Sequence, residues 1–313
     1  MTVVVAGEAL VDLAPRDGLL LPLPGGSPYN VAVGLGRLGS ETHYLGGLSR
    51  DAFGALMSAR LAADGVVLDL APVVDEPTTL AVVHLDDQGR ASYGFYLDGT
   101  SAAGLQESML AELPPDAALH VSLGAIGLGH VPTGRTLLRL LEDAHRERLT
   151  SLDPNVRPSV FARAGGVEAY ATLVDGLVTR HLDLVKVSDE DLALLHPETA
   201  DPLDVARVWA RSGPSLVVVT RGPDGAVAVR DGHRDVEVAG RTVEVVDTVG
   251  AGDAFTSGLL AWLDQHGRLT RAGLDRLTDD ELMAALRQAA EVAAITCTRA
   301  GSDPPRAGEL AAA

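Results

Sequence analysis

The sequence predicts an α/β fold in which helices cover a mostly parallel β-sheet. From about residue 117, short apolar runs alternate with stretches of helical apolar spacing, which is the pattern of βα units. The 313 residues show no internal repeat, low-complexity linker or clear domain cut, so we expect a single domain. An early pair of β-rich runs falls outside the βα rhythm and indicates a separate small sheet.

The predicted elements follow from local patterns along the chain. Residues 3–6 form a continuous apolar run, typical of a strand buried on both faces. Residues 79–85 and 91–97 flank a polar turn and predict a hairpin. The other predicted strands are 119–122, 149–152, 184–187, 216–220, 226–230 and 236–246. The predicted helices are 31–38, 57–63, 134–147, 167–180, 189–195, 202–211, 251–265 and 279–294.

Charge and cysteine content exclude several classes of protein. With 25 basic and 43 acidic residues, the chain carries a net charge of −18, which opposes binding to nucleic acid or to anionic membranes. An anionic substrate would need a local positive pocket. The single cysteine, Cys297, excludes an internal disulfide and Cys-x-x-Cys zinc sites. Since the chain has neither a signal-peptide pattern nor a long apolar stretch, we expect a cytoplasmic protein.

The sequence does not fit two common nucleotide-binding motifs. Residues 34–39 read Gly-x-Gly-x-x-Gly, but the dinucleotide fingerprint requires this pattern directly after a strand. Here the pattern lies inside a predicted helix, where small residues allow close packing. A Walker A loop is excluded because the chain contains no Gly-Lys pair, and Lys186 is its only lysine.

The strongest local signal is the segment 245–255. A β-rich run leads into the turn Gly250-Ala251-Gly252, which opens an apolar helix. Unshielded backbone amides at a helix start form an anion site. Asp253 would stand beside a bound phosphate, where it would accept the proton of an attacking hydroxyl. The alternative is that Asp253 only caps the helix, and local chemistry leaves both interpretations open.

Residues 247–255, Asp-Thr-Val-Gly-Ala-Gly-Asp-Ala-Phe, resemble the signature of the ribokinase-like (PfkB) carbohydrate kinases. Residues 25–32, 47–54 and 220–225 are similar to further patterns of that family, in the same order along the chain. The resemblance implies one domain over residues 1–313, a three-layer α/β/α sandwich with a mostly parallel central sheet. It also implies a small β-sheet lid formed by residues of about 13–24 and 75–100.

The resemblance also implies roles for individual residues. Asp253 matches the general base, and Gly250, Ala251 and Gly252 match an anion hole that contacts the transferring phosphoryl group and the nucleotide. Positions matching the sugar site are Asp12, Gly25, Gly26 and Asn30. Positions matching the nucleotide site are Thr220, Gly222 and Gly225. Positions matching a monovalent-cation loop for K⁺ are Asp247, Val249, Thr296, Arg299 and Gly301.

The chain departs from the family at the usual Asn-x-x-Glu motif. Ser188 and Asp191 replace the Asn and Glu, and both could bond water on a Mg²⁺ ion, which retains waters readily. Lys186 could reach the nucleotide phosphates, or it could point to solvent from a strand end. The metal contact of Asp191 is therefore an expectation that the departure leaves open.

Two further stretches bear on the sugar. Residues 153–158, Asp-Pro-Asn-Val-Arg-Pro, resemble the fructokinase and 2-keto-3-deoxysugar kinase branches, and Arg157 would supply positive charge near phosphate. The alternative for Asp-Pro-Asn is a simple turn. Tyr93, Phe95 and Tyr96 lie in the predicted hairpin, where their rings would either cover the sugar or fill the core of the lid.

The resemblance implies an ATP-dependent sugar kinase, with fructose as the first expectation and Mg²⁺ and K⁺ as cofactors. Alternatives within the class are 2-keto-3-deoxygluconate kinase, ribokinase and nucleoside kinase. A non-catalytic sugar-binding regulator would be expected to lose the base or an anion-hole glycine, and this chain keeps both. We expect a small-molecule sugar and ATP as partners, and an exposed lid edge could pair two copies into a homodimer.

Overall fold

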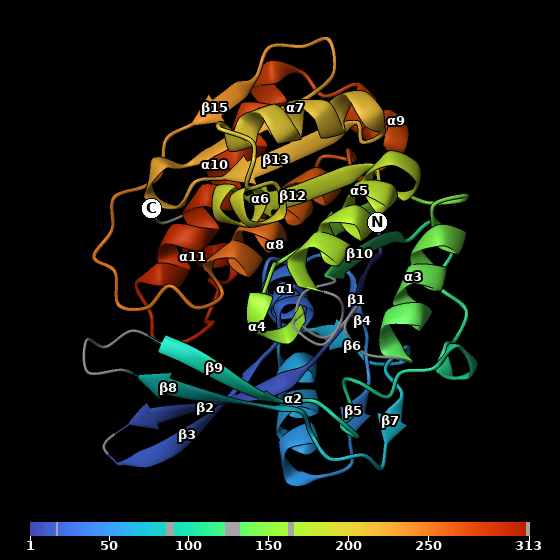
Figure 1. Cartoon of the computed structure of the whole chain (residues 1–313), viewed down its shortest axis with the longest axis vertical. Coiled ribbons are helices and arrows are strands. Elements are labelled where there is room, and N and C mark those ends of the chain that lie inside the picture. The colour runs from blue at the N-terminus through green and yellow to red at the C-terminus, as the bar shows by residue number, and fades with distance from the viewer. Residues whose placement is uncertain (17, 86–90, 123–131, 162–165, 311–313) are drawn as a thin grey trace.

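The computed structural model describes the chain except for residues 17, 86–90, 123–131, 162–165 and 311–313 (Figure 1). A nine-stranded sheet forms the centre, in the order β15-β14-β13-β12-β11-β10-β1-β4-β6. Pairs from β13 to β6 are parallel, and only β14 and β15 join antiparallel. The strands are β1 (Val3–Ala6), β4 (Thr42–Leu45), β6 (Val66–Val67), β10 (Ala118–Ser122), β11 (Thr150–Asp153), β12 (Leu184–Ser188), β13 (Leu216–Thr220), β14 (Ala226–Val229) and β15 (Val236–Val238).

Helices cover both faces of this sheet and make the predicted three layers. Alternate residues of each strand enter different cores: Val3 and Val5 pack on one side and Val4 on the other. One core contains residues of α1 (Ser27–Arg37), α2 (Ala52–Ala63), α8 (Ala251–Gln265), α9 (Arg271–Asp275) and α10 (Asp279–Cys297). The other contains residues of α3 (Thr133–Ala144), α5 (Gly166–His181), α6 (Asp189–Leu195) and α7 (Pro202–Ser212).

A separate four-stranded sheet lies at one end of the molecule, at the bottom of Figure 1. Its order is β3-β2-β8-β9, and the β8–β9 hairpin is the one that the sequence predicts. The predicted turn at 86–89 lies outside the described residues. The strands are β2 (Leu10–Arg16), β3 (Leu19–Gly25), β8 (Leu80–Leu85) and β9 (Ala91–Tyr96); β5 (Leu48–Ser49) and β7 (Val73–Val74) form a further small pair.

The Gly-x-Gly-x-x-Gly pattern serves helix packing, as the sequence predicts. Gly34 and Gly36 lie within α1. A Cβ atom on Gly34 would lie 2.6 Å from Cβ of Ser257 in α8, and one on Gly36 would overlap the carbonyl oxygen of Asp64. Side chains at either position would push α1 away from its neighbours. Gly34 therefore allows α1 to approach α8 closely, and Gly36 allows it to approach the end of α2.

The predicted strand 236–246 is wrong beyond Val238, where β15 ends. Val245 and Val246 are 59% and 62% exposed, and the Val246 amide donates to the carbonyl of Cys297 at 2.8 Å instead of to a strand. Gly240 lies so close to the carbonyl of Pro223 that a Cβ would overlap it, so a side chain at this position would displace the chain. This β-branched run is a solvent-exposed connection that leads to α8.

Several helices begin before their predicted starts. Helix α1 begins at Ser27, and α2 begins at Ala52, after the cap residue Asp51 accepts a hydrogen bond from the Gly54 amide at 2.8 Å. Strand β4 was not predicted, although Tyr44 and Leu45 in it are fully buried. Within the described residues, no helix is both long and apolar enough to cross a bilayer.

Candidate active site

The site is built where the first turns of α1 and α8 meet. The Asp253 carboxylate, in the first turn of α8, accepts hydrogen bonds from Ser27 Oγ at 2.6 Å and from Asn30 Nδ2 at 2.8 Å. Ser27 Oγ in turn accepts a hydrogen bond from Oγ of Ser122, at the end of β10, at 3.0 Å. Helix α8 begins after Gly250, a left-handed residue (φ 75°), and has no side-chain cap among the described residues. The Asp253 carboxylate thus bonds side chains of α1 and does not cap α8, although it remains an acidic group in the first turn of that helix.

The surroundings of Asp253 favour proton uptake. Burial raises the pKa of Asp253, and the hydrogen bonds from Ser27 and Asn30 oppose that rise without cancelling it. The charge of Asp153 raises the pKa further, and that of Lys186 lowers it. A carboxylate with a raised pKa that is held by two donors is suited to general-base work.

The side chain of Lys186, in β12, reaches the start of α8 and does not point to solvent. Lys186 is 5% exposed, and its Nζ donates a hydrogen bond to Asp153 Oδ2 at 3.0 Å. A Cβ atom on Gly252 would lie 3.0 Å from the same Nζ. Burial lowers the pKa of Lys186, but the Asp153, Asp191 and Asp253 carboxylates outweigh it, so the pKa is raised and the group is an ammonium at neutral pH. The solvent alternative is wrong.

The substituted motif keeps a carboxylate beside this ammonium. Ser188 caps α6 by accepting a hydrogen bond from the Asp191 amide at 3.0 Å. Asp191 is buried, and its Oδ1 accepts a hydrogen bond from the Val156 amide at 3.1 Å. Burial and the charge of Asp153 raise the pKa of Asp191. Arg157 is exposed, and its Nη1 donates to the Val156 carbonyl at 2.9 Å.

Glycines shape the side of the site next to the small sheet. A Cβ on Gly25 would lie 2.6 Å from Oδ2 of Asp12, and one on Gly26 (φ 104°) would lie 2.7 Å from the carbonyl oxygen of Glu8. Burial and the charge of Asp253 raise the pKa of Asp12 to about 6. Burial is also the main cause that raises the pKa of Glu8 to about 7, and Glu8 Oε2 has no hydrogen-bond partner among the described residues.

Among the aromatic candidates, Phe95 packs against a small cluster that includes Leu10, Ala81 and Leu97. This contact fits the alternative that the ring fills the core of the small sheet. Tyr96 is 64% exposed, and the side chain of Tyr93 lies outside the described part of the structure.

The nucleotide candidates lie at the end of β13 and in the following turn. Thr220 ends β13, and its Oγ1 is 3.5 Å from the carbonyl of Val187, the limit of a hydrogen bond. Gly222 has φ 51° and Gly225 has φ 95°, and a Cβ on Gly225 would overlap the carbonyl of Val238. These glycines shape a tight turn and leave its backbone uncovered.

The predicted cation loop is held together by one carboxylate. Asp247 accepts two hydrogen bonds: Oδ1 accepts one from the Val249 amide at 3.0 Å, and Oδ2 accepts one from the Gly301 amide at 2.8 Å. Thr296 Oγ1 donates within α10, and the Arg299 guanidinium pairs with acidic side chains. The described residues hold no cluster of three His, Cys, Asp or Glu side chains suited to a metal.

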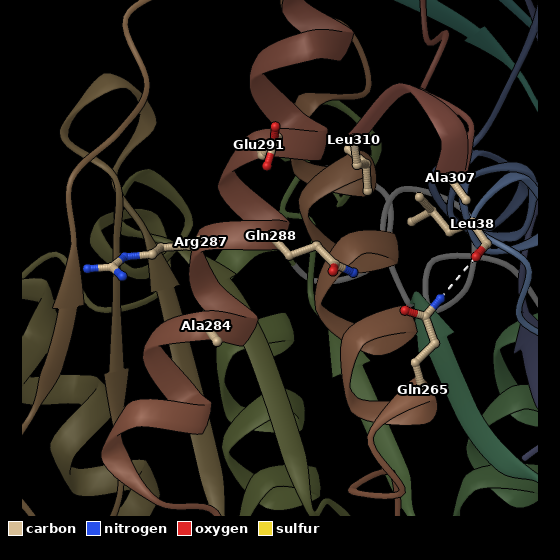
Figure 2. A pocket seen from close by; sticks show the side chains of 8 residues that line it. All are labelled: Leu38, Gln265, Ala284, Arg287, Gln288, Glu291, Ala307 and Leu310. Carbon is tan, nitrogen blue, oxygen red and sulfur yellow. Dashed lines mark hydrogen bonds between the residues drawn. The ribbon is translucent and has the colours of Figure 1, made fainter. Parts of the chain in front are cut away.

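A pocket of about 530 Å³ lies elsewhere, at the opposite end of α8 (Figure 2). Gln265 lines it and donates to the carbonyl of Leu38 at 3.0 Å, and α10 and α11 (Ala307–Leu310) supply further walls. Gln265 follows Asp253 by twelve positions in α8, about 18 Å at 1.5 Å per residue. The pocket is therefore not part of the polar site.

Around the start of α8 the structure brings together Asp253, Asn30 and Lys186, and it adds three residues for which the sequence predicted no role. Ser27 holds Asp253, Asp153 holds Lys186, and Glu8 is buried nearby. Ser27 lies in the family-like stretch 25–32, and Asp153 lies in the stretch 153–158. Their partners are distant in sequence, and no local pattern identifies them.

Comparisons with known proteins give a consistent result. Residues 22–307 match the model of the pfkB family carbohydrate kinases. A fructokinase of Rhizobium leguminosarum bv. trifolii is 36% identical over 286 residues, 90% of this chain and 85% of that protein. A fructokinase from Xylella fastidiosa with bound ATP superposes with a TM-score of 0.88 at 27% identity, covering 99% of this chain and 97% of the other.

A double-mutant fructokinase from Vibrio cholerae O395, in fructose-, ADP- and potassium-bound form, superposes with a TM-score of 0.83 at 28% identity. The match covers 96% of this chain and 93% of that chain. Family model, relative and solved structures agree with the geometry at the start of α8. The chain belongs to the pfkB family of carbohydrate kinases and is an ATP-dependent sugar kinase.

Proposed function

We propose that this protein phosphorylates fructose with ATP as the donor. The observation that carries the proposal is the Asp253 carboxylate, held by Ser27 and Asn30 beside the amides that open α8. The sugar hydroxyl gives its proton to Asp253 and attacks the γ-phosphoryl group in line. The Gly250–Gly252 amides and the Lys186 ammonium stabilise the negative charge of the transferring group. The fructokinases among its relatives support fructose as the sugar.

The sugar site has donors and acceptors that suit a polyol. Nδ2 of Asn30 donates a hydrogen bond to Asp253. The buried Oδ1 of Asn30 has no partner among the described residues, so this oxygen can accept a hydrogen bond from a sugar hydroxyl. Asp12 lies against Gly25 and supplies a carboxyl acceptor. In this proposal the sheet of β2, β3, β8 and β9 is a lid. Gly26, Arg157 and the Tyr93 ring border the sugar, and Phe95 fills the core of the lid.

Mg²⁺ fits the carboxylate side of the site. Asp191 retains coordinating capacity beside its bond to the Val156 amide, and Ser188 lies next to it. Because Mg²⁺ keeps most of its waters, one carboxylate and the nucleotide phosphates are enough to hold it, and bound Mg²⁺ would neutralise phosphate charge. Thr220, Gly222 and Gly225 would border the nucleotide. We propose that the enzyme works in the cytoplasm, where ATP is available.

Replacing Asp253 with Asn tests the general base. The amide keeps the shape but accepts no proton, so kcat should fall by about 10²–10⁴-fold while fructose affinity changes little. Asp264→Asn is the matched control, because Asp264 lies in the same helix and pairs with the N-terminal amine at 2.5 Å, far from the site. The control should keep full kcat. Measurements of ADP release and fructose binding on the same samples separate the two effects.

A panel of sugars with the wild-type protein completes this test. Fructose should give the highest kcat/KM, with ribose and 2-keto-3-deoxygluconate lower. Preference for either of those sugars would replace the substrate but not the chemistry. A kcat of Asp253→Asn close to that of wild type would remove the general base and the mechanism with it.

We propose a monovalent-cation site between the Asp247–Val249 loop and the segment at Gly301. A K⁺ ion bound to carbonyls there would fix the turn that carries the anion-hole amides. The rate should therefore rise when K⁺ replaces a bulky organic cation at equal ionic strength. Equal rates in K⁺, Na⁺ and tetramethylammonium would contradict the site. Spectroscopic melting curves in the same salts control for general effects on folding.

We also propose a homodimer formed through the lid. Strand β3 is an edge strand, and Leu19, Leu20 and Leu21 in it are 74%, 52% and 39% exposed. Three consecutive exposed leucines on a sheet edge favour association with another copy. Leu20→Asp should shift the protein from dimer to monomer in sedimentation velocity, whereas Leu194→Asp, at a 43% exposed leucine of α6, should not. A monomeric wild type at micromolar concentration would exclude this dimer.

A further inference from the structure

The segment 301–304 lies directly behind the turn that opens α8. A Cβ atom on Gly250 would lie 2.6 Å from Cβ of Ser302 and would overlap its hydroxyl. The neighbouring Gly301 amide donates to Asp247 Oδ2 at 2.8 Å. The turn from Asp247 to Gly252 therefore has this segment against it at two points. We call residues 301–304 the support segment.

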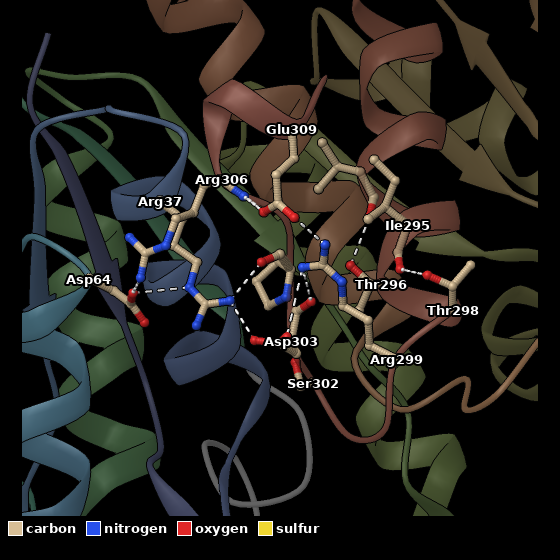
Figure 3. Close-up of polar contacts among 12 residues, drawn as sticks. Arg37, Asp64, Ile295, Thr296, Thr298, Arg299, Ser302, Asp303, Arg306 and Glu309 are labelled. Atoms are coloured by element: carbon tan, nitrogen blue, oxygen red, sulfur yellow. Dashed lines mark hydrogen bonds and ion pairs between the residues drawn. The ribbon is translucent and has the colours of Figure 1, made fainter. Parts of the chain in front are cut away.

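Two arginines from the helices α1 and α2 hold the support segment. Arg60 Nη2 donates to the Ser302 carbonyl at 2.7 Å. Arg37, the last residue of α1, donates through Nη1 to Asp303 Oδ1 and to the Pro304 carbonyl, both at 2.6 Å (Figure 3). Three consecutive residues of the segment are thus bonded to cationic side chains, and such charge-assisted bonds are stronger than neutral ones.

Arg37 is fixed in turn by a buried carboxylate. Asp64, whose side chain is 3% exposed at the end of α2, pairs with Arg37 Nε at 3.0 Å and with Arg306 Nη2 at 2.6 Å (Figure 3). Breaking a buried pair leaves an uncompensated charge, so the geometry of this cluster is costly to change. Arg37 therefore presents its donors to the segment in one defined orientation.

We propose that Arg37 and Arg60 are positioning residues for phosphoryl transfer, because they hold the support segment against Gly250 and so orient the amides that open α8. The inference rests on the proposed role of Gly250–Gly252 as the anion site. Amides stabilise a transition state only when they are aimed at the place where charge develops. Small displacements of such groups cost a large part of the rate.

The same helix connects both halves of the site. The first turn of α1 carries Ser27 and Asn30, which hold the Asp253 carboxylate, and its last residue is Arg37. Helix α1 therefore holds the proposed general base of α8 at its first turn, and it holds the support segment behind the anion-hole turn at its last residue. A role limited to anchoring the C-terminal segment would affect stability but not the chemical step.

The test compares Arg60→Gln, Arg60→Lys and Arg139→Gln. Arg139 is the control, since it forms an exposed pair with Asp143 on α3 at 3.1 Å, away from the support segment. Rates are measured with ATP and fructose well below the melting temperature of each variant. Arg60→Gln should lower kcat by about 10-fold, with KM for fructose within about 2-fold of wild type, because the sugar residues are not displaced. Arg60→Lys should recover most of kcat, and Arg139→Gln should match wild type.

Asp303→Asn provides a second route if Arg60→Gln does not fold. Asp303 is partly exposed, and the change weakens the Arg37 anchor without removing a buried charge. It should lower kcat by about 3-fold, again with KM for fructose unchanged.

Each outcome decides between the alternatives. An unchanged kcat with a lower melting temperature, in either variant, shows a merely structural role and overturns the inference. Equal changes in kcat and in KM for fructose also overturn it, since they indicate general damage to the site. A wild-type protein that phosphorylates no sugar rejects the proposed function together with the inference, whereas an active wild type with an equally active Arg60→Gln rejects only the inference.

Discussion

The contact between the first turns of α1 and α8 is the constraint on which the site depends. A buried carboxylate is costly without partners, and Asp253 has two, both from α1. The contact exists because the two helices approach closely, with Gly34 of α1 against Ser257 of α8. A larger residue at position 34 would separate the helices and remove the donors from Asp253. The glycines of α1 thus serve the site although they contact no part of it.

The sheet supplies the second half of the arrangement. Ser122, Asp153 and Lys186 lie at or near the carboxyl ends of the adjacent parallel strands β10, β11 and β12. In open α/β sheets this edge is where ligands bind. The chain is strongly acidic, yet its single lysine is buried here and paired with Asp153. Lys186 and the amides at the start of α8 are the positive groups that this edge offers to an anionic substrate in a protein of net charge −18.

Local sequence patterns predicted the elements with strong and continuous signals. The bounds of β1, β13, α6 and α8 agree with the apolar runs and helix starts. The pattern failed at 239–246, because β-branched residues alone do not provide a strand partner. It also failed to place Ser27, since its contact with Asp253 joins residues 226 positions apart. Contacts between residues so far apart in the sequence depend on how the helices pack, and so does the burial of Lys186.

The pH dependence of kcat/KM in wild type and in Ser27→Ala tests the central claim most directly. In the proposed mechanism activity requires the Asp253 carboxylate, so it should fall as the pH drops through the pKa of Asp253, which burial raises. The Ser27 hydrogen bond lowers that pKa, so Ser27→Ala should move the acid limb to higher pH. Because Glu8 and Asp12 titrate in both proteins, the difference between the profiles isolates Asp253. Superimposable acid limbs would contradict the claim that Asp253, held by α1, is the base.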